Sequence, residues 1–273
     1  MMKVKICNKK LWTNFIKIVS SVAAILSFIL TIVDIDQKPR LIISLIALFL
    51  LVLVFLKKWH SANKQFNKKL TINSTDVTIK YDDLFSQQGI KVIGFNEFFD
   101  TQVDEKIISS SSLNGVFITQ HSAGASSIDS TIDNEVRLIK NVVERDVSRL
   151  YGGKTIRYKL GSICPVEDYF LLALSRFDED NRATISIEDY ISCLMHMWNE
   201  LNRYYAGKPI SMPLLGSGIT RFNNAELSPQ ELLKYIIMTF KASKVKFNNT
   251  SSLTIVLNEK IKDEINLYDI QED

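Results

Sequence analysis

The sequence has few of the residues that build disulfide frameworks, metal sites and catalytic triads. It contains three cysteines and three histidines among its 273 residues. The cysteines are odd in number, lie far apart and form no C-x-x-C pair, which argues against a disulfide framework or a zinc site. No two histidines have the spacing of metal ligands, and no Ser–His–Asp or Cys–His pattern is recognisable. The sequence therefore predicts free thiols, no metal site and no catalytic residues.

A large excess of charge of one sign is also missing. The chain has 33 lysines and arginines against 30 aspartates and glutamates, a formal net charge of +3. Proteins that bind nucleic acids usually carry a pronounced basic field. The near balance of charge therefore indicates that the partner is not a nucleic acid.

Long apolar runs are present, and they lie before residue 57. Phe15–Val33 carries one charge, Lys17, close to its start, and a second run covers Leu41–Leu56. A helix needs about 20 apolar residues to cross a bilayer, with a range of about 17–25. The lysines and tryptophan at 57–59 extend the shorter second run toward the headgroups. The sequence therefore predicts a transmembrane hairpin over residues 14–56.

The charges around the hairpin predict its orientation. Four lysines precede the first run and five lie between residues 57 and 69, whereas Asp34–Arg40 balances two basic residues with two aspartates. By the positive-inside rule, both chain ends are cytoplasmic and the protein lies in the inner membrane as a multi-pass protein. Pro39 favours a tight polar loop at Asp34–Arg40. Residues 1–13 are then a cytoplasmic segment and residues 57–72 a juxtamembrane linker.

Two other interpretations of the apolar runs fit less well. A cleaved signal peptide has one apolar run and a small-residue cleavage site, and this chain has a second run and no clear A-x-A site. A buried helical hairpin of a soluble protein would have a polar stripe on each helix. The glycosylation sequons at Asn73 and Asn249 are read as chance, because the domain that carries them is expected in the cytoplasm.

From residue 73 onward, strand-like segments alternate with helical patterns, which predicts a sheet flanked by helices on both faces. Ser186 with Asp189, and the capping box at Ser228–Glu231, are helix start signals. The Ser-rich segment Ser109–Ser130 is expected to be a mobile or ligand-binding loop. The predicted strands are 77–81, 91–95, 155–160, 169–174, 210–215 and 252–257, and the predicted helices begin at 133, 187, 229 and 259.

Ligands of such sheets bind at the carboxyl ends of the strands. Gly216 to Thr220 follow a strand directly, and glycines there let backbone N–H groups approach a phosphate. An ordinary tight turn would account for the same residues. The segment is neither a Walker loop nor a G-x-G-x-x-G motif. Asn96 ends another strand and is followed by Phe99 and Asp100, where an amide can bind ribose hydroxyls and an aromatic can stack. Turn chemistry explains these residues equally well.

Together these segments resemble a macro domain. The likeness rests on Asp83, on VIGFN at 92–96 and FFDT at 98–101, on LNGVFI at 113–118 and on PLLGSGITRF at 213–222. With the two N-terminal spans, the chain is more specifically similar to the membrane-anchored macro-domain effectors of type II Thoeris antiphage systems. The resemblance implies a macro-domain-like mixed sheet over residues 73–273.

The resemblance also implies roles for individual residues. Asp83 matches the acid that accepts from adenine, and Asn96 the asparagine near the distal ribose. Gly115 lies in the segment that covers the ligand, and Phe222 matches the aromatic beside the distal ribose. The loop of Gly216, Ser217, Gly218, Ile219 and Thr220 matches the diphosphate loop, and the ligand-binding set also includes Phe99 and Asp100.

In that family a TIR-domain partner that consumes NAD makes a nucleotide signal. The resemblance implies a ligand of the histidine-conjugated ADP-ribose type, no other cofactor, oligomerisation on activation, membrane disruption and death of the infected cell. Hydrolytic macro domains usually carry a glycine run after the asparagine, and here that region has four serines at 109–112. This favours a binding role over an enzyme. A membrane-tethered ADP-ribosyl hydrolase and a scaffold without a ligand are the alternatives.

Overall fold

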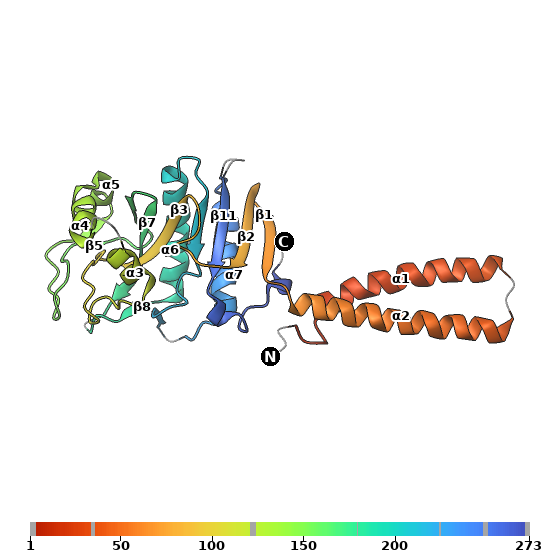
Figure 1. The fold of residues 1–273 in the computed structure, drawn as a ribbon. Coiled ribbons are helices and arrows are strands. Elements are labelled where there is room, and N and C mark those ends of the chain that lie inside the picture. Colours follow the sequence, from red (N-terminus) through yellow and green to blue (C-terminus); the bar gives the residue numbers. More distant parts are fainter. Residues whose placement is uncertain are drawn as a thin grey trace. The chain divides into compact units, whose positions relative to one another are not determined.

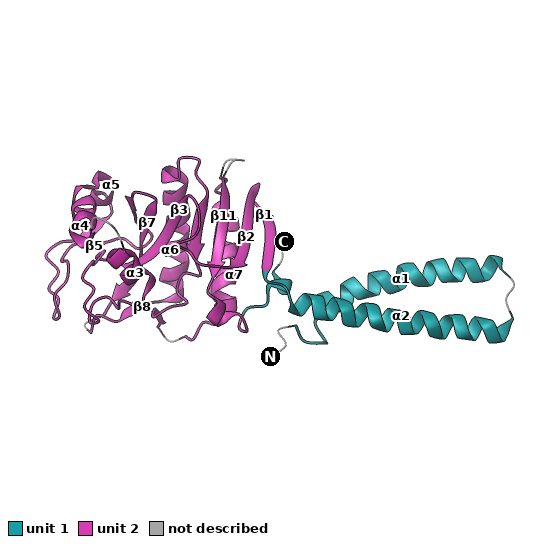
Figure 2. Ribbon diagram, in the orientation of Figure 1, with its two compact units in different colours: residues 1–66, 265–271 teal, residues 67–264, 272–273 magenta. Residues whose placement is uncertain are grey.

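The computed structural model describes residues 4–33, 36–120, 124–178, 180–223, 225–247 and 251–270. The chain divides into two compact units, shown in Figure 2. The first contains residues 1–66 and 265–271, and the second contains residues 67–264 with the last two residues. Each unit has a hydrophobic core of its own.

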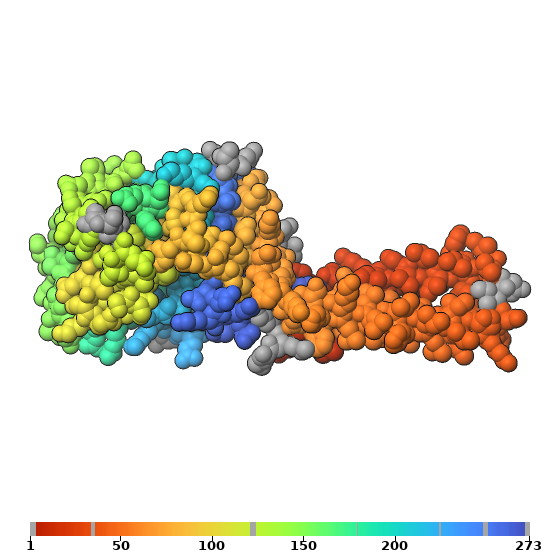
Figure 3. Space-filling model, viewed as in Figure 1, coloured from red at the N-terminus to blue at the C-terminus, as the bar shows by residue number. Residues whose placement is uncertain are grey.

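The first unit is built on two long apolar helices, α1 (Lys9–Ile32) and α2 (Gln37–Asn63), drawn in Figure 1. Both are long and apolar enough to cross a membrane, and almost none of their most apolar stretches is buried. In the space-filling view their side chains, red and orange, lie at the surface (Figure 3), and Phe28 and Leu41 are 69% and 63% exposed. Buried core helices would be covered by other residues. We therefore regard α1 and α2 as candidate membrane spans.

The connection between the two helices is shorter than predicted. Helix α2 begins at Gln37, after the N-cap residue Asp36, so that Pro39 lies in the first helical turn. The N–H groups of a first turn have no partner within the helix, and proline, which lacks this group, is tolerated there. The prediction of a loop over Asp34–Arg40 is therefore wrong from Gln37 onward. Residues 34 and 35 lie outside the described residues.

A small cluster of side chains packs where α1 begins and α2 ends. It includes Tyr268 from the 3-10 turn η2 (Leu267–Asp269), so the C-terminal segment belongs to the hairpin unit. Lys10 Nζ donates to the carbonyl oxygen of Tyr268 at 2.8 Å, and Asn14 Nδ2 donates to the Tyr268 hydroxyl at 3.1 Å. The other members of the cluster are Val4, Leu11, Phe15, Phe55, Trp59 and Ala62.

The helix predicted from residue 259 is wrong beyond its first turn. The structure has a 3-10 turn η1 (Glu259–Ile261) and the separate turn η2. Ile265, Leu267 and Ile270 are each at most 4% exposed. Their burial in the tertiary structure explains the apolar spacing that the sequence pattern attributes to one helical stripe.

The second unit contains a mixed sheet of nine strands within the described residues, in the order β1-β2-β11-β9-β3-β7-β8-β10 with β6 beside β7. Strands β2, β11, β9, β3 and β7 run parallel to one another, whereas β1, β6 and β8 are antiparallel to a neighbour. The bounds are β1 (Asn67–Ile72), β2 (Thr75–Tyr81), β3 (Ile90–Asn96), β6 (Ile163–Val166), β7 (Tyr169–Phe177), β8 (Ala183–Ile185), β9 (Ile210–Pro213), β10 (Arg221–Phe222) and β11 (Ser252–Leu257). A separate antiparallel pair is formed by β4 (Val142–Glu144) and β5 (Arg157–Tyr158).

Helices flank the sheet, as Figure 1 shows. Ser186 accepts from the Asp189 N–H at the start of one of them, and Ser228 with Glu231 forms the predicted capping box of another, so both start signals are confirmed. The helices are α3 (Leu113–Gln120), α4 (Gly124–Asn134), α5 (Val136–Ile139), α6 (Ile187–Tyr204) and α7 (Pro229–Ser243).

Three regions differ from the sequence prediction. The expected linker 57–72 contains the end of α2 and all of β1, because Leu70 and Ile72 are buried in the sheet. The expected loop Ser109–Ser130 contains α3 and most of α4, since the apolar residues of these helices enter the core. The helix expected from residue 133 is instead α5 followed by β4. The sequon at Asn249 lies outside the described residues, and the Asn73 side chain donates to the Phe240 carbonyl oxygen.

Candidate functional site

The carboxyl ends of four parallel strands meet at one edge of the sheet. Strands β2, β11, β9 and β3 lie side by side and run in the same direction. Three of them end at or just before residues predicted to bind a ligand: Asp83 after β2, Gly216–Thr220 after β9, and Asn96 at the end of β3. The topology therefore brings these sequence-distant segments to the edge where ligands of parallel sheets bind.

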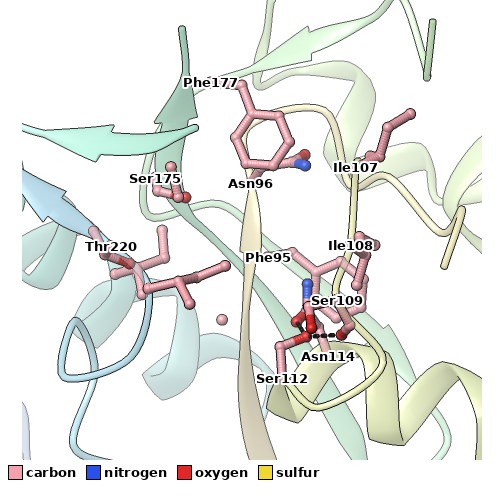
Figure 4. Close-up of a pocket in the computed structure, with 14 residues that line it drawn as sticks. Phe95, Asn96, Ile107, Ile108, Ser109, Ser112, Asn114, Ser175, Phe177 and Thr220 are labelled. Carbon is pink, nitrogen blue, oxygen red and sulfur yellow. Dashed lines mark hydrogen bonds between the residues drawn. The ribbon is translucent and has the colours of Figure 1, made fainter. Parts of the chain in front are cut away.

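A cavity opens beside the end of β3 (Figure 4). Of the predicted ligand-binding residues, Asn96, Ile219 and Thr220 line it. Figure 4 shows Thr220 on one side of the cavity and Ser112 with Ile108 on the other. The remaining lining residues are Gly94, Phe95, Ile107, Ser109, Asn114, Leu174, Ser175, Phe177 and Ala183.

Asn96 forms part of the cavity wall and also organises the turn after β3. Its Nδ2 donates to Asp100 Oδ2 at 2.9 Å, and its Oδ1 accepts from the backbone N–H groups of Phe98 and Asp100. The register of β3 with β7 shifts between Phe95 and Asn96. The Asn96 amide is therefore held in one orientation by the turn that it caps.

Behind this turn lies a buried ion pair. Asp100 is 1% exposed and accepts from Arg149 Nη1 at 2.7 Å and from the Lys154 N–H at 2.7 Å. The Arg149 guanidinium also donates to Asn181 and lies 4.3 Å from the centre of the Phe98 ring. Asp100 therefore supports the cavity wall through the turn, while its own carboxylate is satisfied by protein groups.

Two residues close to Asn96 in the chain do not line the cavity. Phe99 has a φ of 51° and is fully buried, with its ring 5.4 Å from that of Tyr158 in the hydrophobic core. Glu97 is also buried, and this burial raises the pKa of its carboxyl, while Arg176, 3.5 Å away, opposes the shift. The structure thus places Phe99 and Glu97 in supporting positions.

The four serines form a turn that leads into α3. Ser112 Oγ accepts a hydrogen bond from the Gly115 N–H at 3.1 Å and donates one to the Ser109 carbonyl oxygen at 2.5 Å. Ser109 and Ser111 share a hydrogen bond between hydroxyls. The side chains of this turn bind one another and the backbone, so local hydrogen bonds shape the segment beside the cavity.

Gly115 is required for this arrangement. A methyl group at Gly115 would lie 2.1 Å from the Ser109 carbonyl oxygen. We expect Gly115→Ala to displace the serine turn and to lower the free energy of unfolding by about 1–3 kcal/mol, as overpacking does elsewhere. Gly218→Ala is the matched control, since no described atom lies within 4 Å of its added methyl group. Urea unfolding measures both, and equal stabilities would contradict the role given to Gly115.

The loop after β9 presents unpaired backbone donors. Ser217 turns back on the chain, with both its N–H and its hydroxyl donating to the Leu214 carbonyl oxygen. Gly216 has a φ of 84°, which favours glycine. Among the described residues, the N–H groups of Gly216, Gly218, Ile219 and Thr220 have no hydrogen-bond partner. Successive free N–H groups of this kind form a concave site for an anion such as a phosphate.

Asp83 and Phe222 lie at the borders of this edge. Asp83 is exposed, and its Oδ1 accepts from the Phe85 N–H, whereas the neighbouring Asp82 binds Lys80, which lowers the pKa of Asp82 to about 2. The Phe222 ring would lie 3.2 Å from a methyl group at Gly216. Neither residue lines the cavity beside β3, so their predicted ligand contacts stay predictions.

Sequence reasoning missed part of the cavity wall. Ser175 and Phe177 end β7, and Ile107 and Ile108 precede the serine turn. Ser109, Ser112 and Asn114 fall in the segment that the sequence marked as a possible ligand loop. The sequence carries no local signal for Ser175, because the pairing of β7 with β3 appears only in the sheet.

The described residues contain neither a candidate metal site nor a buried thiol with a lowered pKa. No group of three or more His, Cys, Asp and Glu residues there could hold a metal ion. Burial raises the pKa of the Cys164 and Cys193 thiols to about 12, which makes both cysteines poor nucleophiles.

Comparison with known proteins identifies the family of this chain. A family model described as Thoeris protein ThsA, Macro domain, matches residues 77–258. The chain belongs to this family. The Thoeris protein ThsA of Bacillus amyloliquefaciens (strain Y2) is 39% identical over 257 residues, which cover 93% of this chain and 84% of that protein. The ThsA assignment confirms the predicted macro-domain fold and the Thoeris resemblance.

Solved macrodomain structures are similar to this chain at much lower sequence identity. A structure of the Oceanobacillus iheyensis macrodomain with ADP has 13% sequence identity and a TM-score of 0.44, covering 74% of this chain and 92% of that one. A structure of the same macrodomain with MES bound has 14% identity and a TM-score of 0.43, covering 74% of this chain and 93% of that one.

Proposed function

We propose that this ThsA-family protein is an antiphage effector whose macro domain binds an ADP-ribose-derived signal. The observation that carries the proposal is the loop 216–220, which has N–H groups without a partner among the described residues and lies beside a cavity lined by Asn96. In the proposed complex the diphosphate binds to the loop, and the ribose with its substituent occupies the cavity. The signal is of the histidine-ADP-ribose type and comes from a TIR-domain partner that consumes NAD.

The hairpin is the output of the proposed effector. Its exposed apolar side chains fit a lipid environment, and the lysines at its ends favour cytoplasmic termini by the positive-inside rule. A single pair of helices encloses no water-filled path, so several hairpins act together after ligand binding. The resulting membrane disruption stops phage growth by killing the infected cell.

Binding without turnover is proposed for two reasons. The serine turn 109–112 stands where hydrolytic macro domains usually have glycines, and its side chains bind one another. The Asn96 side-chain amide is hydrogen-bonded to Asp100 and to backbone groups. Its orientation is therefore fixed by the protein. A membrane-tethered hydrolase remains the competing function, and release of ADP-ribose from a modified substrate would support it instead.

Gly218→Val is the variant that tests the ligand site. Its side chain enters space that is free of described atoms, so the fold should persist while the path to the loop is blocked. At about 100 times its Kd, ADP-ribose or its histidine conjugate should stabilise the wild-type chain by roughly 2.7 kcal/mol. Gly218→Val should lose this stabilisation, measured by thermal unfolding with and without nucleotide.

Met238→Val is the control for this test, because Met238 is an exposed residue of α7. It should keep the full stabilisation. Asn96→Ala should also abolish binding, but it removes hydrogen bonds of the turn as well, which makes Gly218 the cleaner position. Normal nucleotide binding by Gly218→Val would show that the site lies elsewhere.

A further inference from the structure

Tyr190 is a buried tyrosine that is hydrogen-bonded to the residue before the anion-binding loop 216–220. It lies in the first turn of α6, fully buried, and its hydroxyl donates to the Leu215 carbonyl oxygen at 2.8 Å. Burial raises the pKa of this hydroxyl well above its usual value, so it remains a donor at neutral pH. A buried tyrosine hydroxyl normally has such a partner, but here the partner is the carbonyl next to Gly216.

The position of that carbonyl fixes the direction of a neighbouring donor. In a trans peptide the C=O of one residue and the N–H of the next point in opposite directions, and the described chain has no cis peptide bond. Because the Leu215 C=O points inward to Tyr190, the Gly216 N–H points away from the protein interior. This N–H is one of the unpaired donors of the loop.

The same ring also supports the end of the loop. The Tyr190 ring packs edge-on against Phe222, with 5.3 Å between the ring centres, and Phe222 in turn lies close to Gly216. After Phe222 the chain is held by a hydrogen bond from the Asn223 N–H to the Ile185 carbonyl oxygen. Tyr190 therefore contacts both the first peptide of the loop and the aromatic residue that closes it.

We propose that Tyr190 is a positioning residue that holds the Gly216 N–H, and with it the loop, in the orientation that binds the diphosphate of a nucleotide. This inference rests on the proposed function of the loop and adds a residue that touches no ligand. Preorganised donors bind an anion without first having to be reoriented. Without the tyrosine hydroxyl, the peptide between Leu215 and Gly216 is free to rotate. The Gly216 N–H then points away from the diphosphate for part of the time.

Tyr190→Phe tests the inference because it keeps the ring contacts and removes one hydroxyl. In the full-length chain in detergent, we expect the Kd for ADP-ribose to rise about tenfold, the effect of one hydrogen bond. The affinity for adenosine, which has no diphosphate, should change less than twofold. Hydrogen exchange at residues 216–220 should become faster, while exchange in the core of β9 and β11 stays slow.

Tyr235→Phe is the matched control. The Tyr235 ring contacts the Tyr190 ring edge-on, with 6.4 Å between centres, but its hydroxyl has no hydrogen-bond partner among the described residues. It should leave both the Kd and the loop exchange at wild-type values. The inference is overturned if Tyr190→Phe behaves like Tyr235→Phe, or if it weakens adenosine as much as ADP-ribose. A wild-type chain that binds no ADP-ribose would refute the proposed function, and the exchange comparison would still decide the role of Tyr190.

Discussion

Replacing Ile46 and Phe49 together by arginine is expected to abolish the toxicity of this protein in cells that produce its signal. Both side chains lie in the middle of α2 and are more than half exposed. A charged side chain at the centre of a membrane helix costs about 2.5–3.5 kcal/mol by insertion scales, and two of them oppose insertion strongly. The macro domain should still be stabilised by nucleotide, because its core is separate from the hairpin unit.

The control for this variant is a double arginine substitution on the macro domain. Val136 and Met238 are also more than half exposed, but they belong to the second unit. Val136→Arg with Met238→Arg should leave toxicity intact. Survival is measured after phage infection, or after expression of the TIR-domain partner, with nucleotide binding measured on the purified variants. Undiminished killing by the hairpin variant would refute a membrane output and favour the hydrolase.

Arg149→Met is expected to cause the largest loss of stability of any single substitution in the candidate site. Its partner Asp100 is buried and would keep an uncompensated charge, and breaking a buried ion pair in this way costs about 3–5 kcal/mol. That is a large fraction of the roughly 5–15 kcal/mol by which domains are stable. The turn capped by Asn96 should loosen as well, since Asp100 is its hydrogen-bond partner.

An exposed ion pair of the same chemistry provides the comparison. Arg182 and Asp180 are 3.2 Å apart with about half of each side chain exposed, so Arg182→Met should change stability by only about 0–1 kcal/mol. Chemical denaturation of both variants at neutral pH gives the difference directly. Equal losses would mean that the Asp100–Arg149 pair does not support the cavity wall.

The predictions of α1, α2, α6 and α7 succeeded because their signals are local. Each signal acts within one turn or one helix, so the sequence alone identifies it. The signals are the apolar runs of α1 and α2 and the capping residues Ser186 and Ser228. The failures occur where burial depends on distant partners. Strand β1 looks like a lysine-rich linker until β2 pairs with it, and α3 looks like a serine-rich loop until its apolar side chains enter the core.

The candidate site divides in the same way. Asn96 at the end of one strand and the glycine-rich loop after another can be recognised in the sequence. Turns favour asparagine and glycine at such positions, and glycines leave backbone N–H groups accessible. Which strands are neighbours is not visible, and so Ser175, Phe177 and Tyr190 were missed. Phe99 and Asp100 were chosen for their side chains, whereas the structure shows one in the core and the other paired with Arg149.

The sequence by itself determined that two apolar helices precede an α/β domain, and its motifs identified the family. Helix length, hydropathy and capping depend on neighbouring residues, so they need no tertiary information. Only the tertiary structure decided that the C-terminal segment packs on the hairpin through Tyr268, and which donors of the loop remain free. Those properties depend on contacts between residues far apart in the chain, for which a single sequence carries no local signal.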